Sequence, residues 1–279
     1  MKGSKGRDMK RALVLVLALL VAASFTSVTA QVKAKDGFYF AEQTTYPSSG
    51  WRYQVVIEVK GGKIVKATWN GINNKGLPDK ITEASAGRYG MKKVSKLGKE
   101  WHEQAATVEE FLIKTQDVGF AKFTTPEGNT DAIAGASIHV KEYFDLVKEA
   151  LAKPAVAKGM YKKDGWFYAK APAFDKSGYA ATALVTIVNG RIVSVQWNAL
   201  HKAGGDSKLV RAEKGTYKMN AKLGEWNVQA LKAEEALIKE QDPAKINVKA
   251  DGHTDAISGV SVTVGEFLTV AAEALKGAK

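Results

Sequence analysis

Short stretches of alternating apolar and polar residues predict a β-hairpin at two places in the chain. In the first, VVIEV leads through a Gly61–Gly62 turn to KIVKATW, where Val65, Ala67 and Trp69 would share one face. In the second, an Asn189–Gly190 turn precedes the same alternation, in Val193, Val195 and Trp197. Asn-Gly favours a two-residue hairpin because both residues tolerate positive φ. The sequence therefore predicts the same hairpin twice.

Helical spacing follows each predicted hairpin, after a loop rich in lysine and glycine. One apolar stripe consists of Trp101, Ala105, Val108 and Leu112, and its counterpart of Trp226, Ala230, Ala233 and Leu237. A second helix is traced by Ile138, Tyr143, Phe144, Val147 and Leu151, and again by Val262, Phe267, Leu268, Ala271 and Leu275. In the second copy, we expect Thr263 and Glu266 to form a capping box. Each copy is predicted to be α+β, an antiparallel sheet with packed helices.

Matched landmarks show that the chain is a tandem repeat. The matching pairs are KDGFYFA and KDGWFYA, GGKIVKATWN and NGRIVSVQWN, WHEQA and WNVQA, and TDAIAGASIH and TDAISGVSVT. Only small deletions separate the two copies, which indicates duplication. We place repeat 1 at residues 31–153, a linker that contains Pro154 at residues 154–159, and repeat 2 at residues 160–279.

The first thirty residues are predicted to be an export signal. A basic start precedes the apolar run ALVLVLALLVAA, and small residues before Gln31 offer a cleavage site. The run is shorter than the roughly 20 residues that a spanning helix needs, and an uncleaved membrane anchor is the alternative. We expect an exported chain, in the periplasm or at the cell surface. Cysteine is absent, which excludes disulfides and thiolate chemistry and fits a bacterial envelope protein stabilised by packing.

The charge balance points to no nucleic-acid partner. The formal net charge is +12, and removal of residues 1–30 would leave 36 basic and 28 acidic residues, a net charge of +8. The lysines are scattered, without the basic run and interleaved aromatic residues of a nucleic-acid surface. A weakly cationic surface would attract anionic envelope polymers or a phosphorylated cofactor.

The closing motif of each copy resembles the signature Asp-x-x-(Ser/Thr)-Gly-Ala-(Thr/Ser) of the FMN-binding domain family. It reads DAIAGAS from Asp131 to Ser137 and DAISGVS from Asp255 to Ser261. That family also shows an opening like DGFYFA and a hairpin like GGKIVKATW, so the resemblance covers nearly all of both repeats. It implies that FMN is carried through a phosphoester on the last Ser/Thr of the signature, here Ser137 and Ser261, installed by a flavin transferase.

Other motif residues have expected roles as well. By the family's pattern, Asp131 and Asp255 orient the acceptor hydroxyl or hold a metal ion during transfer. Gly135 and Gly259 let the backbone turn tightly and approach the ligand. A hydroxyl placed just before a helix would hold a phosphate near unsatisfied N–H groups and the positive end of the helix dipole. Two positions depart from the signature, Ala134 and Val260, so covalent FMN, noncovalent FMN and an empty domain all remain open.

The remaining chemistry-bearing residues yield no catalytic or metal site. The recurring tryptophans, Trp69, Trp101, Trp197 and Trp226, are expected in the core rather than against an isoalloxazine ring, because each lies on an apolar stripe. Better candidates for a ring-facing wall are Tyr89 with Met91 and Tyr217 with Met219. No histidine keeps its identity in both copies, and neither a Ser-His-Asp set nor a P-loop is present.

The sequence therefore favours an exported electron carrier with flavin at one or both repeats, between a membrane redox donor and an extracellular acceptor. The alternative is a surface or periplasmic binding module that has kept the fold and lost covalent flavin. A reversible flavin reservoir is a third possibility. An enzyme ranks last, since no acid, base or nucleophile occupies matched positions in both copies.

Overall fold

The computed structural model describes residues 32–279, and the export signal predicted at residues 1–30 lies outside these described residues. Each repeat forms a three-stranded antiparallel sheet with its strands in chain order. The first sheet contains β1 (Gly37–Glu42), β2 (Trp51–Lys60) and β3 (Lys63–Asn73), and the second contains β4 (Gly165–Lys170), β5 (Tyr179–Val188) and β6 (Arg191–His201). The predicted α+β class is confirmed.

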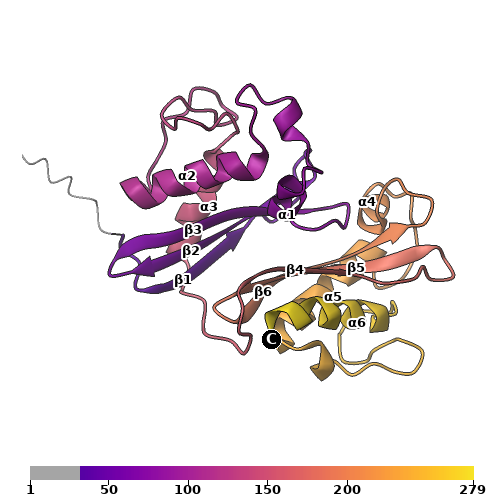
Figure 1. Cartoon of the computed structure of the whole chain (residues 1–279). Coiled ribbons are helices and arrows are strands. Elements are labelled where there is room, and N and C mark those ends of the chain that lie inside the picture. The colour runs from indigo at the N-terminus through magenta and orange to yellow at the C-terminus, as the bar shows by residue number, and fades with distance from the viewer. Residues whose placement is uncertain (1–31) are drawn as a thin grey trace, which may run out of the picture.

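The helices of each repeat cover one face of its own sheet. Repeat 1 has α1 (Lys80–Ser85), α2 (Trp101–Thr115) and α3 (Lys141–Ala152), and repeat 2 has α4 (Lys208–Glu213), α5 (Trp226–Glu240) and α6 (Gly265–Leu275). Short 3₁₀ segments are η1 (Met91–Lys93), η2 (Pro243–Lys245) and η3 (Lys276–Ala278). Helices α2 and α3 lie on the first sheet, and α5 and α6 lie on the second. The free faces of the sheets meet, which gives the layer order helix, sheet, sheet, helix (Figure 1).

The predicted hairpins are present, but one detail of their facing is wrong. The second turn has positive φ at both Asn189 (52°) and Gly190 (70°), as expected. In the first hairpin Val65 is 45% exposed, whereas Ile64 is 1% exposed. A β-bulge between Glu58 and Val59 leaves Val65 unpaired and turns it out of the core. The second hairpin has the same irregularity, and there Val193 is unpaired and half-buried.

The predicted helical stripes form the two hydrophobic cores. All eight stripe residues of α2 and α5 are buried, in two separate clusters. The tryptophans pack edge to face, with ring centroids 5.2 Å apart for Trp69 and Trp101 and 5.1 Å apart for Trp197 and Trp226. Core packing, the expected role of these four residues, is confirmed.

The expected capping box at the start of α6 is wrong. The N-cap of α6 is Val264, which has no side-chain cap, and Thr263 precedes it. The backbone N–H groups of Val264 and Gly265 instead donate to Gly252 O, at 2.8 and 3.1 Å. A carbonyl group from the preceding turn therefore replaces the side-chain cap. In repeat 1, Val140 N donates to Gly128 O in the same way.

Polar side chains join the two sheets. Trp166 Nε1 and Thr186 Oγ1 both donate to Gln54 Oε1, at 2.5 and 3.1 Å. Glu42 Oε2 accepts hydrogen bonds from Gln54 Nε2 and Ser194 Oγ, both at 2.8 Å. Buried polar groups that satisfy one another in this way fix a specific register between two surfaces. Directional bonds between polar side chains therefore help to hold the two repeats together.

None of the helices formed by residues 32–279 combines the length and apolar character needed to span a bilayer.

Candidate functional site

Each closing motif forms a loop that is fastened to the preceding helix by one buried glutamine. Ser137 is exposed, and its backbone N–H and its hydroxyl both donate to Gln104 Oε1, at 2.8 and 3.1 Å. Ser261 is exposed as well, and the same groups donate to Gln229 Oε1, at 2.6 and 3.2 Å. Both glutamines are fully buried. Two serine hydroxyls therefore stand at equivalent, solvent-facing positions.

The expected placement of these serines at a helix N-terminus is wrong. Helix α3 begins at Lys141 and α6 begins at Gly265, so neither serine lies in or directly before the first turn. The helix dipole acts mainly within that turn. In addition, the serine N–H groups are already bonded to glutamine rather than free for an anion. Another source of positive charge is needed if a phosphate binds here.

Lysine side chains provide that charge next to each motif glycine. The backbone φ is 89° at Gly135 and 76° at Gly259, a conformation that favours glycine, as the tight turn required. Lys232 Nζ donates to Gly259 O at 3.2 Å. A Cβ atom placed on Gly135 would lie 3.5 Å from Lys99 Nζ. Both loops thus carry an ammonium group over the glycine, which suits a phosphate.

The two motif aspartates lie apart from the serines. Asp131 and Asp255 are exposed, and Asp255 pairs with Lys249 at 2.7 Å. Within residues 32–279 neither aspartate forms a hydrogen bond to the serine of its motif. The same part of the chain holds no group of three or more His, Asp and Glu side chains suited to a metal ion. The structure therefore brings together serine, glycine, glutamine and lysine, but not the aspartate.

A cavity of about 540 Å³ adjoins the motif of repeat 2. Motif residues 256–258 line one side, and the outer face of α5 and the segment after η2 line the other. Three lysines and two glutamates line it together with apolar groups: Lys232, Lys239, Lys245, Glu235, Glu240, Ile246 and Ile257. Cofactor sites commonly have this size, with apolar walls and a few polar groups. With three lysines and two glutamates, the lining keeps a small excess of positive charge, which favours an anionic group at its lysine side.

The sequence did not predict the buried lysine at the start of α1. Lys80 is 1% exposed, and its Nζ donates to Tyr53 OH at 2.8 Å. The ammonium group lies 4.5 Å from the ring centroid of Trp101 and 4.7 Å from that of Tyr89, and the ring of Trp51 is near as well. Burial lowers the pKa of Lys80 to about 7. We call this arrangement the lysine cage of repeat 1.

Repeat 2 has the corresponding cage around Lys208. Its Nζ lies 4.9 Å from the ring centroid of Tyr217 and 5.1 Å from those of Tyr179 and Trp226. Burial lowers the pKa of Lys208 as well. The candidate ring-facing tyrosines, Tyr89 and Tyr217, therefore face a lysine of their own repeat. The only sequence signal for these cages is that a lysine follows a capping residue at the same place in both copies, DKIT and SKLV.

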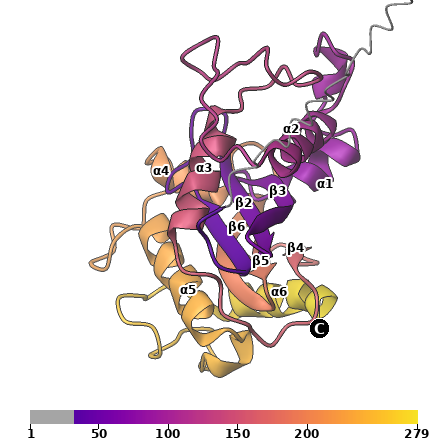
Figure 2. The same cartoon turned by 90° about the vertical axis from the view of Figure 1, so that its left-hand side faces the viewer.

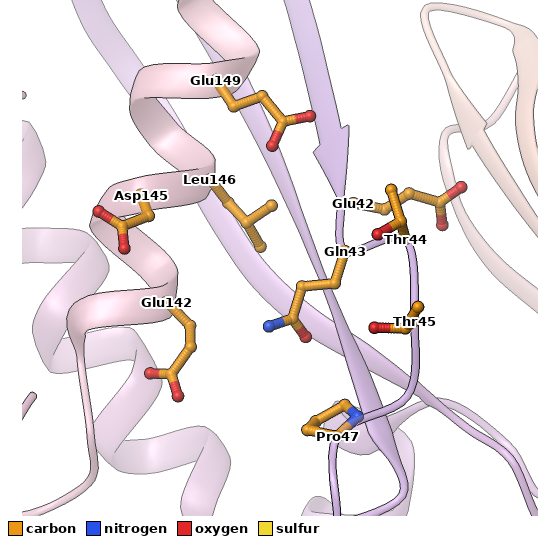
Figure 3. Close-up of a pocket in the computed structure, with 9 residues that line it drawn as sticks. All are labelled: Glu42, Gln43, Thr44, Thr45, Pro47, Glu142, Asp145, Leu146 and Glu149. Atoms are coloured by element: carbon orange, nitrogen blue, oxygen red, sulfur yellow. The ribbon is translucent and has the colours of Figure 1, made fainter. Parts of the chain in front are cut away.

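An acidic pocket of about 340 Å³ lies between α3 and the β1–β2 connection (Figure 3). Glu149 extends from α3 towards the segment that carries Glu42 and Gln43, Glu142 lies lower on the helix, and Asp145 points away and pairs with Lys141 at 2.5 Å. Carboxylates repel a phosphate. This pocket is therefore not a candidate for the phosphate end of FMN.

Comparisons with known proteins give a likeness to two solved structures. One is a structural-genomics target from Clostridium thermocellum, solved by solution NMR, with 48% sequence identity over 41% of this chain and 91% of the other, at a TM-score of 0.34. The other is a crystal structure of a Clostridium perfringens protein, with 26% identity over 43% of this chain and 87% of the other, also at a TM-score of 0.34. No protein-family model matches the chain, and no curated protein matches it.

Proposed function

We propose that this chain is an exported FMN-binding protein, an electron carrier with flavin at one or both repeats. One observation carries the proposal: an exposed serine, a buried glutamine and a lysine meet at the same point of both repeats. Bound flavin would supply the redox chemistry, and the protein would bind and orient it. A membrane redox donor and an extracellular acceptor are the partners that such a carrier requires.

The chain's own residues would prepare the serine for attachment. A glutamine carbonyl oxygen is only an acceptor, so it holds the hydroxyl hydrogen towards the protein and leaves the oxygen lone pairs facing solvent. Attachment would need a flavin dinucleotide as the donor: the serine oxygen would attack the phosphorus of its FMN half, the P–O bond of the pyrophosphate would break, and a nucleoside monophosphate would leave. The serine proton would pass to a base of the flavin transferase, because a glutamine amide is not basic enough to take it. Lys99 or Lys232 would then lie beside the phosphoester and partly neutralise its negative charge.

Repeat 2 is the stronger candidate for a loaded site. Its motif borders the lysine-lined cavity of about 540 Å³. Val260, which departs from the family signature, is 8% exposed and belongs to the hydrophobic core, whereas Ser261 is exposed. The branched side chain therefore points away from the surface that a transferase would approach.

Two loaded sites would work independently of each other. The motif loops are bonded to α2 and α5, which lie on the outer sides of the two sheets (Figure 2). Both sheets and part of each outer helix layer lie between the loops, so the path is longer than the about 10 Å that separates the stacked sheets alone. We expect each flavin to exchange electrons with an external partner rather than with the flavin of the other repeat.

The test is co-expression of the full chain with a flavin transferase, followed by intact mass under denaturing conditions. We expect a gain of one or two FMN units, with one unit lost in Ser261→Ala and any second unit lost in Ser137→Ala. Ser258→Ala is the matched control, because Ser258 lies in the same loop and borders the same cavity. An unmodified mass, with no yellow cofactor before denaturation, would leave the binding module as the better account.

A further inference from the structure

A second cavity, of about 350 Å³, lies between the two repeats. Repeat 1 contributes Tyr46 and Arg52, and repeat 2 contributes α4 and one face of α5, including Asn227, Ala230 and Glu234. We call it the inter-repeat cavity. It is separate from the motif loop because the glutamine and lysine that hold that loop, Gln229 and Lys232, lie on another face of α5.

Two residues that line this cavity each carry a buried polar atom with no hydrogen-bond partner within residues 32–279. One is the donor Arg52 Nε and the other is the acceptor Asn227 Oδ1, so the two repeats each contribute one. Most buried polar atoms in native proteins are paired, and leaving one unpaired costs free energy. A molecule that accepts from Arg52 and donates to Asn227 would satisfy both atoms at once.

The guanidinium group is held in place on its other sides. Arg52 Nη2 lies 3.5 Å from Glu42 Oε2, and the guanidinium carbon lies 5.2 Å from the ring centroid of Tyr46. Among residues 32–279 the Nε–H group itself has no hydrogen-bond partner, whereas Nη2 lies beside Glu42. A single N–H of a guanidinium group can donate to a carboxylate oxygen.

The carboxyl groups around the cavity set the charge that a ligand should carry. Glu234 Oε1 accepts from Trp197 N at 2.7 Å, and desolvation raises the pKa of Glu234 to about 8, so this group stays largely protonated at neutral pH. Glu213, at the end of α4, is exposed and also lines the cavity. Arg52 and Glu213 thus give the lining one group of each charge, which suits a molecule with both charges.

We propose that the inter-repeat cavity binds a small zwitterionic α-amino acid. Its carboxylate accepts from Arg52 Nε, and its ammonium group donates to Asn227 Oδ1 and faces Glu213. Leu209 and Ala230 provide the apolar surface for a small side chain. Because the site is built from both repeats, occupancy would also stabilise their association.

The test is a titration of the full chain with L-alanine, followed by NMR at the Arg52 Nε–H signal. We expect a saturable shift, and binding about tenfold or more weaker in Asn227→Leu, as for the loss of a hydrogen bond to a charged group. L-lactate replaces the ammonium group with a hydroxyl and should bind more weakly than L-alanine. His102→Leu, at the matching position of repeat 1, is the control and should leave binding unchanged.

Several results would overturn this proposal. They are the absence of any saturable shift with L-alanine, equal binding of L-lactate, and unchanged binding in Asn227→Leu. The flavin proposal is tested separately, since Ser261→Ala should retain binding of L-alanine and Asn227→Leu should retain the FMN mass gain. Failure of one site would therefore leave the other intact.

Discussion

Repeats 1 and 2 enclose a lysine at the same point of the fold, but to different depths. Lys80 is fully buried among four aromatic rings and bonded to Tyr53 OH, whereas Lys208 is half-buried beside three rings. The β5 residue that corresponds to Tyr53 is Ala181. Burial disfavours the ammonium ion, whereas the rings favour it. Both repeats thus keep the lysine but differ in the residues around it. We therefore expect the two lysines to contribute differently to the free energy of unfolding.

The largest expected difference concerns removal of the lysine. At about pH 10, where the pKa of about 7 leaves Lys80 neutral in the folded state, Lys80→Ala would leave a cavity among the rings and should lower the free energy of unfolding by about 2–5 kcal/mol, as for other large buried side chains. Lys208→Ala, at a half-buried position, should cost about 1 kcal/mol. Urea denaturation of both variants measures this contrast. Lys80→Met is the volume-matched control and should cost less than Lys80→Ala; equal losses in the two repeats would contradict the comparison.

The second prediction uses pH. With a folded pKa of about 7 and an unfolded pKa of about 10.4, Lys80 binds fewer protons in the folded state across this interval. Its contribution to stability is therefore lost below about pH 7 and recovered as pH rises towards 10, with a slope of at most about 1.4 kcal/mol per pH unit. Denaturation from pH 7 to 10 should show this rise in the wild type and not in Lys80→Met. If stability still rose from pH 7 to 10 in Lys80→Met, groups other than Lys80 would cause the slope.

Glutamates should give the opposite slope at lower pH. Desolvation raises the pKa of Glu109 to about 7 and that of Glu234 to about 8. These groups bind more protons folded than unfolded, so stability should fall as pH rises from about 4.3 towards neutrality. Glu109→Gln and Glu234→Gln should each flatten this fall in a pH series of unfolding curves. If stability decreased with pH in both variants as much as in the wild type, these two glutamates would not be its cause.

A smaller effect is expected at the cage hydroxyl. Tyr53→Phe removes the acceptor of Lys80 Nζ while keeping the ring, and should cost about 1 kcal/mol. Repeat 2 has alanine at the corresponding position and therefore serves as the reference for a cage without this hydroxyl. A thermal melt of the variant measures the loss, and a stabilising substitution would show that the hydrogen bond does not favour the fold.

The smallest expected difference concerns the motif loops. Gln229 Oε1 accepts from Ser261 N, Ser261 Oγ and Val262 N, whereas Gln104 Oε1 accepts from Ser137 alone. Loss of Gln229 should therefore release its loop more. Hydrogen exchange at the serine amide should be about tenfold faster in Gln229→Leu, through local opening, and less affected in Gln104→Leu. The reverse order would contradict this account.

The periodicity of apolar residues predicted those features of the fold that depend on the spacing of neighbouring residues. The stripes of α2 and α5 follow from the 3.6-residue period, and the turn at Asn189 follows from residue types that tolerate positive φ. The bulge at Val65 could not be seen, because one extra residue leaves the strand pattern apparently continuous. The cap of α6 depends on the carbonyl group of Gly252, a backbone contact that residue identities do not encode.

The site was predictable only as a motif. The serines and glycines could be named because the motif occurs twice, but the partners that hold and surround them come from other elements. Likewise, Gln54 and Ser194 look like solvent-facing strand residues in the sequence, although they join the two sheets. Which polar face meets another polar face depends on tertiary packing rather than on local pattern.

The most direct test of the flavin proposal is peptide mapping of the chain after co-expression with a flavin transferase. Digestion and tandem mass spectrometry assign each FMN group to one residue, which separates Ser261 from the neighbouring Ser258. The account predicts FMN on Ser261, with Ser137 as the second possible site. Folded protein whose Ser137 and Ser261 peptides both lack FMN would contradict covalent attachment, and FMN on Ser258 would show that the wrong hydroxyl was assigned.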